Sequence, residues 1–208
     1  MNKQLNSIIK SYPLIIPRLY NYLRIFILPI AEIAKYVPEK GKILDVGCGY
    51  GILDIYLAKT SPNRQVIGSE LNSKRVKIAS SVSRTIENVE FFQENLLQGD
   101  KPEKFDGVVL IDLLHHITSI QQQQLLQAVA NILKKDGQLI IKDMDTKPAF
   151  KFYWNLVHDK LMTGFERLNF IGHQELIVKL EEQGFNVSFK KKINHPLYAH
   201  YLLIAIKK

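Results

Sequence analysis

The feature that most constrains the fold is a glycine-rich turn within residues 43–58, which read ILDVGCGYGILDIYLA. Gly47, Gly49 and Gly51 follow a short apolar run and precede residues with helical spacing. Glycine adopts positive φ values and lets a ligand approach the backbone closely. A strand, a glycine turn and a helix in this order predict a binding turn of an α/β protein. The turn therefore favours a nucleotide-like ligand.

Short β-type runs and helical patterns alternate over the first two thirds of the chain. The strand-like runs are 42–46, 65–69, 89–93, 106–111 and 137–142, and the helical patterns are 53–59, 73–83 and 121–134. This alternation predicts a parallel sheet with helices on both faces. Near the end, a helix over 174–183 stops at Gly184, and the runs 185–193 and 199–208 follow with too few residues between them for a crossover. These two runs are expected to pair antiparallel.

A chain of 208 residues fits a single domain, 1–208. We expect four parts in it: an N-terminal helical lid over 1–38, a cofactor-binding core over 39–145, a substrate-side insertion over 146–172, and a C-terminal helix with a β-hairpin over 173–208. The insertion is rich in aromatic residues and follows the fifth strand. Open α/β sheets bind ligands at the carboxyl ends of their strands. The insertion is thus either a wall of the substrate site or core packing against the lid.

The segment 13–30 is apolar, but it contains Arg18, Arg24 and three prolines. It therefore does not satisfy the length of about 20 mostly apolar residues that a spanning helix needs, and it lacks the pattern of a signal peptide. Arg18, Asn21 and Arg24 form a narrow polar stripe opposite an apolar face, as in an amphipathic helix. Two interpretations stay open: the helix packs over the domain as a lid, or its apolar face contacts a membrane or a lipid substrate.

The net charge of +8 favours anionic partners such as nucleic acid or the cytoplasmic face of a membrane, although the charge is scattered. The one dense cluster, 190–192, fits a strand edge whose lysines discourage pairing between sheets. The chain has a single cysteine, Cys48, which excludes an internal disulfide and points to a reducing compartment. We expect a cytoplasmic protein, peripheral at the inner membrane face if residues 13–30 contact lipid.

The spacing of the glycines restricts the chemical class of the ligand. A dinucleotide-binding turn has the pattern G-x-G-x-x-G, whereas this chain has G-x-G-x-G with Ile52 in the place of the third glycine. Asp45, two residues before the first glycine, would oppose a pyrophosphate but suit a cationic group. Glu70 ends the second strand, where an acid hydrogen-bonds ribose hydroxyls. The pattern indicates a nucleoside that carries a positive charge and no phosphates.

Five blocks in order carry a resemblance to a known family: ILDVGCGYG, VIGSELN, VEFFQENLL, FDGVVLIDLLHHI and LKKDGQLIIKD. The chain resembles the class I S-adenosylmethionine-dependent methyltransferases. The resemblance implies an α/β, Rossmann-like, seven-stranded sheet with helices on both faces and an N-terminal helical lid. Six strands would be parallel, and one would be antiparallel in a C-terminal hairpin. It also implies S-adenosyl-L-methionine as the cofactor.

Positions in these blocks imply a set of cofactor-binding residues. Asp45, Gly47 and Gly49 would border the methionine part, Glu70 the ribose and Leu71 the adenine. At Asn95 the family usually has aspartate, but an amide oxygen can also accept from the adenine amino group. Asp112 would lie near the amino or methyl end. The full set is Asp45, Gly47, Cys48, Gly49, Glu70, Leu71, Asn95, Leu96 and Asp112.

Methyl transfer is an in-line displacement, in which the enzyme supplies alignment and a dry site. A hydroxyl or amine acceptor would also need a general base. The candidates for that base are His115, His116, Asp143, Asp145 and the pair His158–Asp159. From these we select His116, His158 and Asp143 as catalytic residues. No metal is expected, because the histidines lack the i, i+4 spacing of a helical zinc site and there is one cysteine.

The aromatic insertion and the apolar N-terminal helix favour a small-molecule or lipid-like acceptor, methylated at oxygen or carbon. A nucleic-acid methyltransferase is the first alternative. Enzymes that methylate the amino groups of bases usually have a block of the D-P-P-Y type after the fourth strand, where this chain has IDLLHH. Methylation at C5 of cytosine needs a catalytic cysteine, and Cys48 lies in the cofactor turn instead. A non-catalytic S-adenosylmethionine-binding module is the second alternative. The intact glycines and Glu70 argue against that one.

Overall fold

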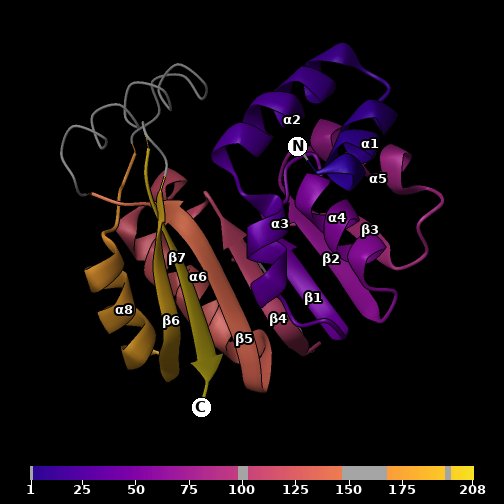
Figure 1. Ribbon diagram of the computed structural model, residues 1–208. Coiled ribbons are helices and arrows are strands. Elements are labelled where there is room, and N and C mark those ends of the chain that lie inside the picture. The colour runs from indigo at the N-terminus through magenta and orange to yellow at the C-terminus, as the bar shows by residue number, and fades with distance from the viewer. Residues whose placement is uncertain (1, 98–102, 147–167, 195–197) are drawn as a thin grey trace. The chain divides into compact units, whose positions relative to one another are not determined.

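The computed structural model describes residues 2–97, 103–146, 168–194 and 198–208 (Figure 1). The chain divides into two compact units, Met1–Val109 and Leu110–Lys208, and each is described by itself below. Most of the predicted substrate-side insertion, including His158 and Asp159, lies outside the described residues.

Seven strands form the sheet in the order β3-β2-β1-β4-β5-β7-β6. β1 pairs with β2, and β2 with β3, in parallel, whereas β7 runs antiparallel to both β5 and β6. The predicted Rossmann-like sheet of six parallel strands and one antiparallel strand is thereby confirmed. The strands are β1 (Gly41–Val46), β2 (Arg64–Glu70), β3 (Val89–Gln93), β4 (Phe105–Ile111), β5 (Leu133–Met144), β6 (Phe185–Asn194) and β7 (Ala199–Lys207).

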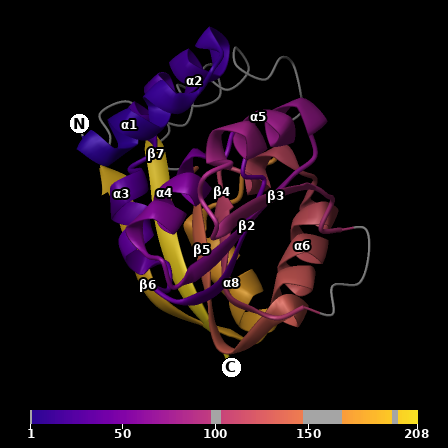
Figure 2. The ribbon, with the colours of Figure 1, turned by 90° about the vertical axis from the view of Figure 1, so that its right-hand side faces the viewer.

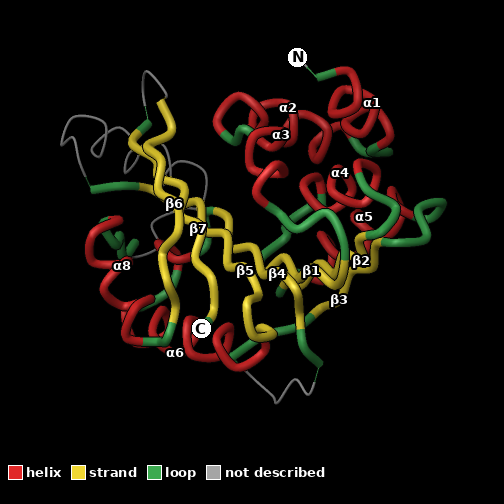
Figure 3. Tube along the Cα trace, turned by 60° about the horizontal axis from the view of Figure 1, so that its bottom comes forward, coloured by secondary structure: helices red, strands yellow, loops and turns green. Residues whose placement is uncertain are grey.

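In the first unit, two helices cover one side of β1, β2 and β3, as Figure 3 shows. They are α4 (Ile52–Thr60) and α5 (Ser73–Ser83). Residues 52–58 of α4 are all buried, because this helix has further helices on its outer side. Asn72 begins α5 by accepting hydrogen bonds from the backbone of Lys74 and Arg75.

Four short elements precede β1: α1 (Lys3–Ser11), α2 (Ile15–Ile27), α3 (Ile30–Ile33) and the 3₁₀ helix η1 (Ala34–Tyr36). α1 buries Leu5, Ile8 and Ile9. It packs against α4 and lies beside α2, as Figures 1 and 2 both show. The predicted helix within 13–30 is thus present, and it begins two residues after Pro13.

The structure shows which face of α2 meets the protein, a question that the sequence left open. The apolar face of an amphipathic helix usually packs inward. Instead the polar Asn21 is buried, while Leu19, Leu23 and Phe26 are exposed. The polar side of α2 faces the protein, and part of it finds partners there. Arg18, for example, donates to the carbonyl oxygens of Lys10 and Tyr12.

In the second unit, α6 (Ser119–Ile132) and α8 (His173–Glu182) lie on one side of β5, β6 and β7 (Figure 3). The 3₁₀ helix η2 (Leu114–His116) precedes α6. Thr118 and Gln121 form a capping box that starts α6. β5 begins directly after this helix, four residues earlier than the run predicted at 137–142, and its centre at Leu139–Ile141 is fully buried.

Candidate functional site

The glycine turn is held against the end of β2. The backbone N–H groups of Gly47 and Cys48 both donate to the carbonyl oxygen of Ser69, at 2.7 and 3.1 Å. Gly47, Gly49 and Gly51 all have positive φ values, 79°, 61° and 75°. Such values are strained for other residues, so the turn requires its glycines. α4 then starts at Ile52 with Gly51 as its N-cap.

The glycines serve two different purposes. A Cβ atom added to Gly51 would lie 2.5 Å from a ring carbon of Phe91, so Gly51 allows close packing inside the protein. A Cβ atom added to Gly49 would meet nothing within 4 Å. The backbone of Gly49 therefore borders open space. Among the described residues, no side chain fills the space beside Gly49, which can therefore accept a ligand.

Glu70 is positioned by the turn itself. Its Oε2 accepts a hydrogen bond from the backbone N–H of Gly49 at 3.0 Å, and its Oε1 accepts from that of Asn72 at 2.9 Å. Arg75 lies 3.7 Å from Oε2. A carboxylate offers about four lone-pair positions, so two stay available beside the two backbone donors. Glu70 can accept hydrogen bonds from two neighbouring hydroxyls, as its predicted role requires.

Asp45 belongs to a buried pair of acids. It lies at the end of β1, and Asp54 approaches it from α4 within hydrogen-bonding reach. Burial raises the pKa of Asp45 to about 7, although Arg24 opposes this shift, and raises that of Asp54 well above its usual value. Two carboxyls in contact and out of water favour a state in which they share a proton. The pair would lose that proton most readily beside a cation.

Sequence reasoning missed Asp54, although one signal was available. Asp54 is the only charged residue in the otherwise apolar stretch ILDIYLA. A charged residue is almost never fully buried without a partner, and the helix pattern placed Asp54 on a helix packed against the sheet. Its partner could not be named from the sequence, because Asp45 is nine positions earlier on a different element.

The N-terminal helices contact the glycine turn, a contribution that the sequence did not reveal. The hydroxyl of Tyr12 donates to the carbonyl oxygen of Tyr50 at 2.7 Å. The ring of Tyr20, on α2, meets the ring of Tyr50 edge-on, with 5.3 Å between centroids. Burial raises the pKa of Tyr12 far above its usual value, so this hydroxyl stays a donor. The N-terminal helices are therefore attached to the glycine turn at Tyr50.

The remaining predicted cofactor residues of this unit differ in exposure. Leu71 is exposed just after Glu70, where an apolar side chain can cover a flat ring, whereas Leu96 is buried. The Oδ1 of Asn95 accepts from the backbone N–H of Leu97 at 3.0 Å and so fixes its own loop. Burial, with the nearby carboxylates, raises the pKa of the Cys48 thiol far above its usual value, so this thiol stays neutral.

In the second unit, Asp112 forms an ion pair that the sequence did not suggest. Its side chain accepts a hydrogen bond from Nζ of Lys142 at 2.5 Å, and its backbone N–H donates to the carbonyl oxygen of Lys142. Lys142 is fully buried on β5. Asp112 has a φ of 51°, an uncommon value for a non-glycine residue that is worth noting near a functional site. This ion pair fixes the side chain predicted to lie near the amino or methyl end of the cofactor.

Asp143 pairs with His115 rather than with His116. The Nδ1 of His115 lies 2.5 Å from Oδ1 of Asp143, and both side chains are buried. Asp143 also accepts from the backbone N–H groups of Leu114 and Met144, at 2.9 and 2.7 Å. Because a carboxylate on Nδ1 fixes that nitrogen as the donor, Nε2 is the ring nitrogen that carries the lone pair in neutral His115.

His116 packs on the face of this pair. Its ring centroid is 4.1 Å from that of His115, and Phe170 stacks on His115 at 5.7 Å. The ring of His200, on β7, stacks on that of Tyr198 at 5.5 Å. His115 and His116 are adjacent in the sequence, so residue type could not tell which of them Asp143 would hold. His158, the other histidine that we selected, lies outside the described residues.

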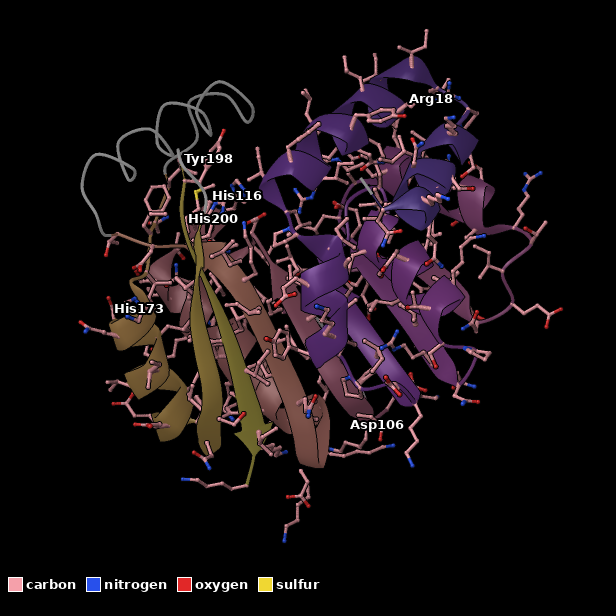
Figure 4. All side chains as sticks on the ribbon, viewed as in Figure 1. Arg18, Asp106, His116, His173, Tyr198 and His200 are labelled. Carbon is pink, nitrogen blue, oxygen red and sulfur yellow. The ribbon has the colours of Figure 1, made fainter. Side chains whose placement is uncertain are left out.

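Asp145 has a structural task. Its Oδ1 accepts from the backbone N–H of Thr146 at 2.9 Å, and its Oδ2 lies 2.9 Å from Nδ1 of His173 at the start of α8. Figure 4 shows His173 on that helix. Within the ranges that the structure describes, no three histidine, cysteine or acidic side chains come together as metal ligands would.

The sequence of the chain matches the model of one protein family. The sequence model described as a methyltransferase domain matches residues 20–188. The chain is 25% identical over 131 residues to (S)-coclaurine N-methyltransferase from Thalictrum flavum subsp. glaucum, covering 62% of this chain and 36% of that protein. It is 27% identical over 124 residues to ubiquinone biosynthesis O-methyltransferase from Xanthomonas axonopodis pv. citri, covering 56% and 48%. The chain thus spans about half or less of the length of these curated relatives.

Solved structures share the fold. Magnesium protoporphyrin IX methyltransferase from Synechocystis, solved with bound S-adenosylhomocysteine, superposes with a TM-score of 0.69 at 19% identity. The match covers 96% of this chain and 86% of the other.

Proposed function

The chain belongs to the class I S-adenosylmethionine-dependent methyltransferases, and from this premise we propose that it methylates a small-molecule or lipid-like acceptor at an oxygen or carbon atom. The parts expected from the sequence, a lid over 1–38, a core over 39–145, an insertion over 146–172 and a C-terminal part over 173–208, belong to the same proposal. So does a cytoplasmic location.

One observation carries the proposal: the open backbone at Gly49 lies beside a positioned carboxylate. Gly49 leaves space where a Cβ would project, and its N–H group holds Glu70 with lone pairs to spare. A nucleoside fits this arrangement, with its sugar on Glu70 and its base beside Leu71. The Asp45–Asp54 pair also suits the cationic end of S-adenosylmethionine, because it can supply a negative charge. The same charge would repel a pyrophosphate.

When bound, S-adenosylmethionine supplies an electrophilic methyl group, because its sulfur is a positively charged leaving group. The residues of the first unit then have three tasks. Glu70 binds the ribose, the acid pair balances the charge, and the lid residues Tyr12 and Tyr20 hold the turn in shape. All three place the reacting group and exclude water, which are the main contributions that such a displacement needs.

For the acceptor we assign His115 as general base in place of His116. Asp143 holds the His115 ring by Nδ1, so Nε2 is the ring nitrogen that would accept a proton from an acceptor hydroxyl. This nitrogen is buried, so a hydroxyl would reach it only when a neighbouring side chain moves. Asp143 becomes a positioning residue in this assignment. His116 packs against the base, and His158 stays a candidate from the sequence.

The names of the relatives support a small organic acceptor. One is called a coclaurine N-methyltransferase and another a ubiquinone biosynthesis O-methyltransferase. They do not identify the acceptor of this chain, and the methylated atom differs between them. Oxygen or carbon stays the proposed atom, and a hydroxyl acceptor would use His115.

A labelled-methyl assay tests the function. The protein is incubated with methyl-labelled S-adenosylmethionine and, separately, with a panel of phenols, catechols, long-chain acids and total RNA. We expect label to enter at least one organic-extractable product. Label that enters RNA alone, or no transfer by a protein that binds the cofactor, would contradict the proposal.

The same assay tests the choice of base. His115→Asn should lower the transfer rate to a hydroxyl acceptor by about 10²-fold or more, the usual contribution of a general base. His116→Asn, the matched control from the adjacent position, should lower it less than ten-fold. Thermal melting and S-adenosylhomocysteine affinity, measured on both variants, separate a folding defect from a catalytic one. Equal losses in both variants would show that His115 has no special role.

A further inference from the structure

The outer face of α2 is a continuous apolar surface. Six large side chains on it are more than half exposed: Leu14, Ile15, Ile16, Leu19, Leu23 and Phe26. Ile15, Ile16 and Phe26 reach 79%, 77% and 72%. Single exposed apolar residues are ordinary, but a contiguous set of this kind marks a binding surface. We call these six residues the α2 apolar face.

The inner face of the same helix is already occupied by polar contacts. Asn21 is fully buried, Arg24 donates to the hydroxyl of Tyr20 at 3.0 Å, and Tyr20 packs on Tyr50 of the glycine turn. Turning the helix to bury its apolar face would break the contact of Tyr20 with Tyr50, move Arg24 away from Asp45 and expose Asn21. The outward direction of the apolar face is thus fixed by the fold.

The charge of the surrounding segment indicates what covers this face. Residues 1–31 contain Lys3, Lys10, Arg18 and Arg24 but no aspartate or glutamate, and the first acidic residue is Glu32. Figure 4 shows Arg18 on α2. Arg18 and Arg24 lie on the inner side of α2, whereas Lys3 and Lys10 of the neighbouring α1 are exposed. An apolar helix face next to exposed lysines, in a segment without acids, complements a surface that is apolar inside and anionic outside. A bilayer with anionic lipids has that composition.

The length of the helix decides how it would meet the bilayer. α2 has 13 residues, which is about 20 Å of helix and shorter than the roughly 30 Å hydrocarbon core of a bilayer. Among the residues described, no helix is both long and apolar enough to span a membrane. The helix can therefore lie only in the plane of the surface.

From these observations we propose that α2 docks the protein on an anionic lipid surface, with the α2 apolar face inserted among the acyl chains. The inner face of α2 would keep its contacts to Tyr50 of the glycine turn. The proposal is independent of the proposed methyl transfer, because lipid binding can be measured without cofactor or acceptor.

Vesicle flotation of the full chain tests the proposal. The probes are vesicles of phosphatidylcholine alone and vesicles that also hold about a third phosphatidylglycerol. We expect binding to the anionic vesicles that weakens several-fold as salt is raised, because surface charge is screened. The double variant Ile16→Ser/Phe26→Ser should reduce the partition coefficient at least ten-fold.

Matched controls come from elsewhere on the chain. Ile120 on α6 and Val178 on α8 are 72% and 54% exposed, and Ile120→Ser/Val178→Ser should change vesicle binding less than two-fold. All four positions are exposed, so both variants should fold, which thermal melting checks. No binding to anionic vesicles, or equal loss in the control, would overturn the proposal. A dimer seen by sedimentation that Ile16→Ser/Phe26→Ser dissociates, without vesicle binding, would assign the face to a second copy instead.

Discussion

At the scale of single residues, the buried acids Asp45 and Asp54 should make the stability of the protein depend on pH. The raised pKa of Asp45, about 7, means that the folded protein binds more protons than the unfolded chain above the ordinary value of 3.8. Stability is linked to this difference in bound protons. The stability that the pair gains from its bound proton is fully present at a pH below the ordinary pKa of 3.8. It is lost as the pH rises through about 7. The free energy of unfolding should therefore fall between these limits.

Replacing Asp54 tests whether the buried pair causes this dependence of stability on pH. Asp54→Asn removes a buried ionisable group and leaves an amide that can donate to Asp45. We expect the variant to gain about 1 to 3 kcal/mol in free energy of unfolding at pH 8 relative to pH 5, compared with the wild type. Denaturant unfolding at both pH values measures it. Glu90→Gln, at an exposed acid on β3, is the control, and an unchanged pH slope in Asp54→Asn would refute the shared proton.

The residues of the site were predictable where residue type alone decides the task. Gly47, Gly49 and Glu70 lie where the motif places them, because a turn with positive φ needs glycine and the end of a strand is fixed by its pattern. Pairings across elements were not predictable. Lys142 beside Asp112, and His115 rather than His116 beside Asp143, depend on distances between strands that no local pattern contains.

At the scale of elements, the N-terminal helices are fixed to the glycine turn by few contacts, and these can be removed singly. Tyr12→Phe deletes the hydroxyl that donates to Tyr50 O at 2.7 Å. Loss of one such bond costs about 0.5 to 1.5 kcal/mol of stability. Because this bond shapes the cofactor turn, the affinity for S-adenosylhomocysteine should also fall, by about three- to ten-fold.

Tyr22→Phe is the matched control for that change. Tyr22 also donates from the lid, to Oδ1 of Asn6 at 2.8 Å, but that bond does not reach the turn. The control should lose a similar amount of stability and keep its ligand affinity. Calorimetric titration and thermal melting of both variants give the comparison. If both lose affinity alike, the lid acts through general stability and not through Tyr50.

Element types followed from periodicity, but the direction of one helix did not. The pattern of α2 shows a polar and an apolar face without saying which one meets the protein. Neighbours outside the helix are what differ between the two faces. Asn21 lies beside Tyr12 and Arg24 near Asp45, whereas Leu19, Leu23 and Phe26 are exposed. Amphipathicity therefore predicts a helix more safely than it predicts what the helix packs against.

At the scale of the whole molecule, the alternation of strands and helices predicted a parallel sheet, and the short connection before the last strand predicted an antiparallel pair. β6 and β7 do pair antiparallel. The number of strands was implied by the family resemblance, and the order β3-β2-β1-β4-β5-β7-β6 was not predicted. The methyl acceptor does not follow from topology, because one fold hosts many reactions.

The central claim is that the turn at Gly49 and the carboxylate of Glu70 hold a sulfur nucleoside. Calorimetric titration of the protein with S-adenosylhomocysteine, compared with Glu70→Gln, tests it most directly. We predict binding by the wild type that Glu70→Gln weakens by about 1 to 3 kcal/mol, the cost of leaving polar groups unpaired. An affinity unchanged by Glu70→Gln, or a wild type that binds a dinucleotide in preference, would contradict the account.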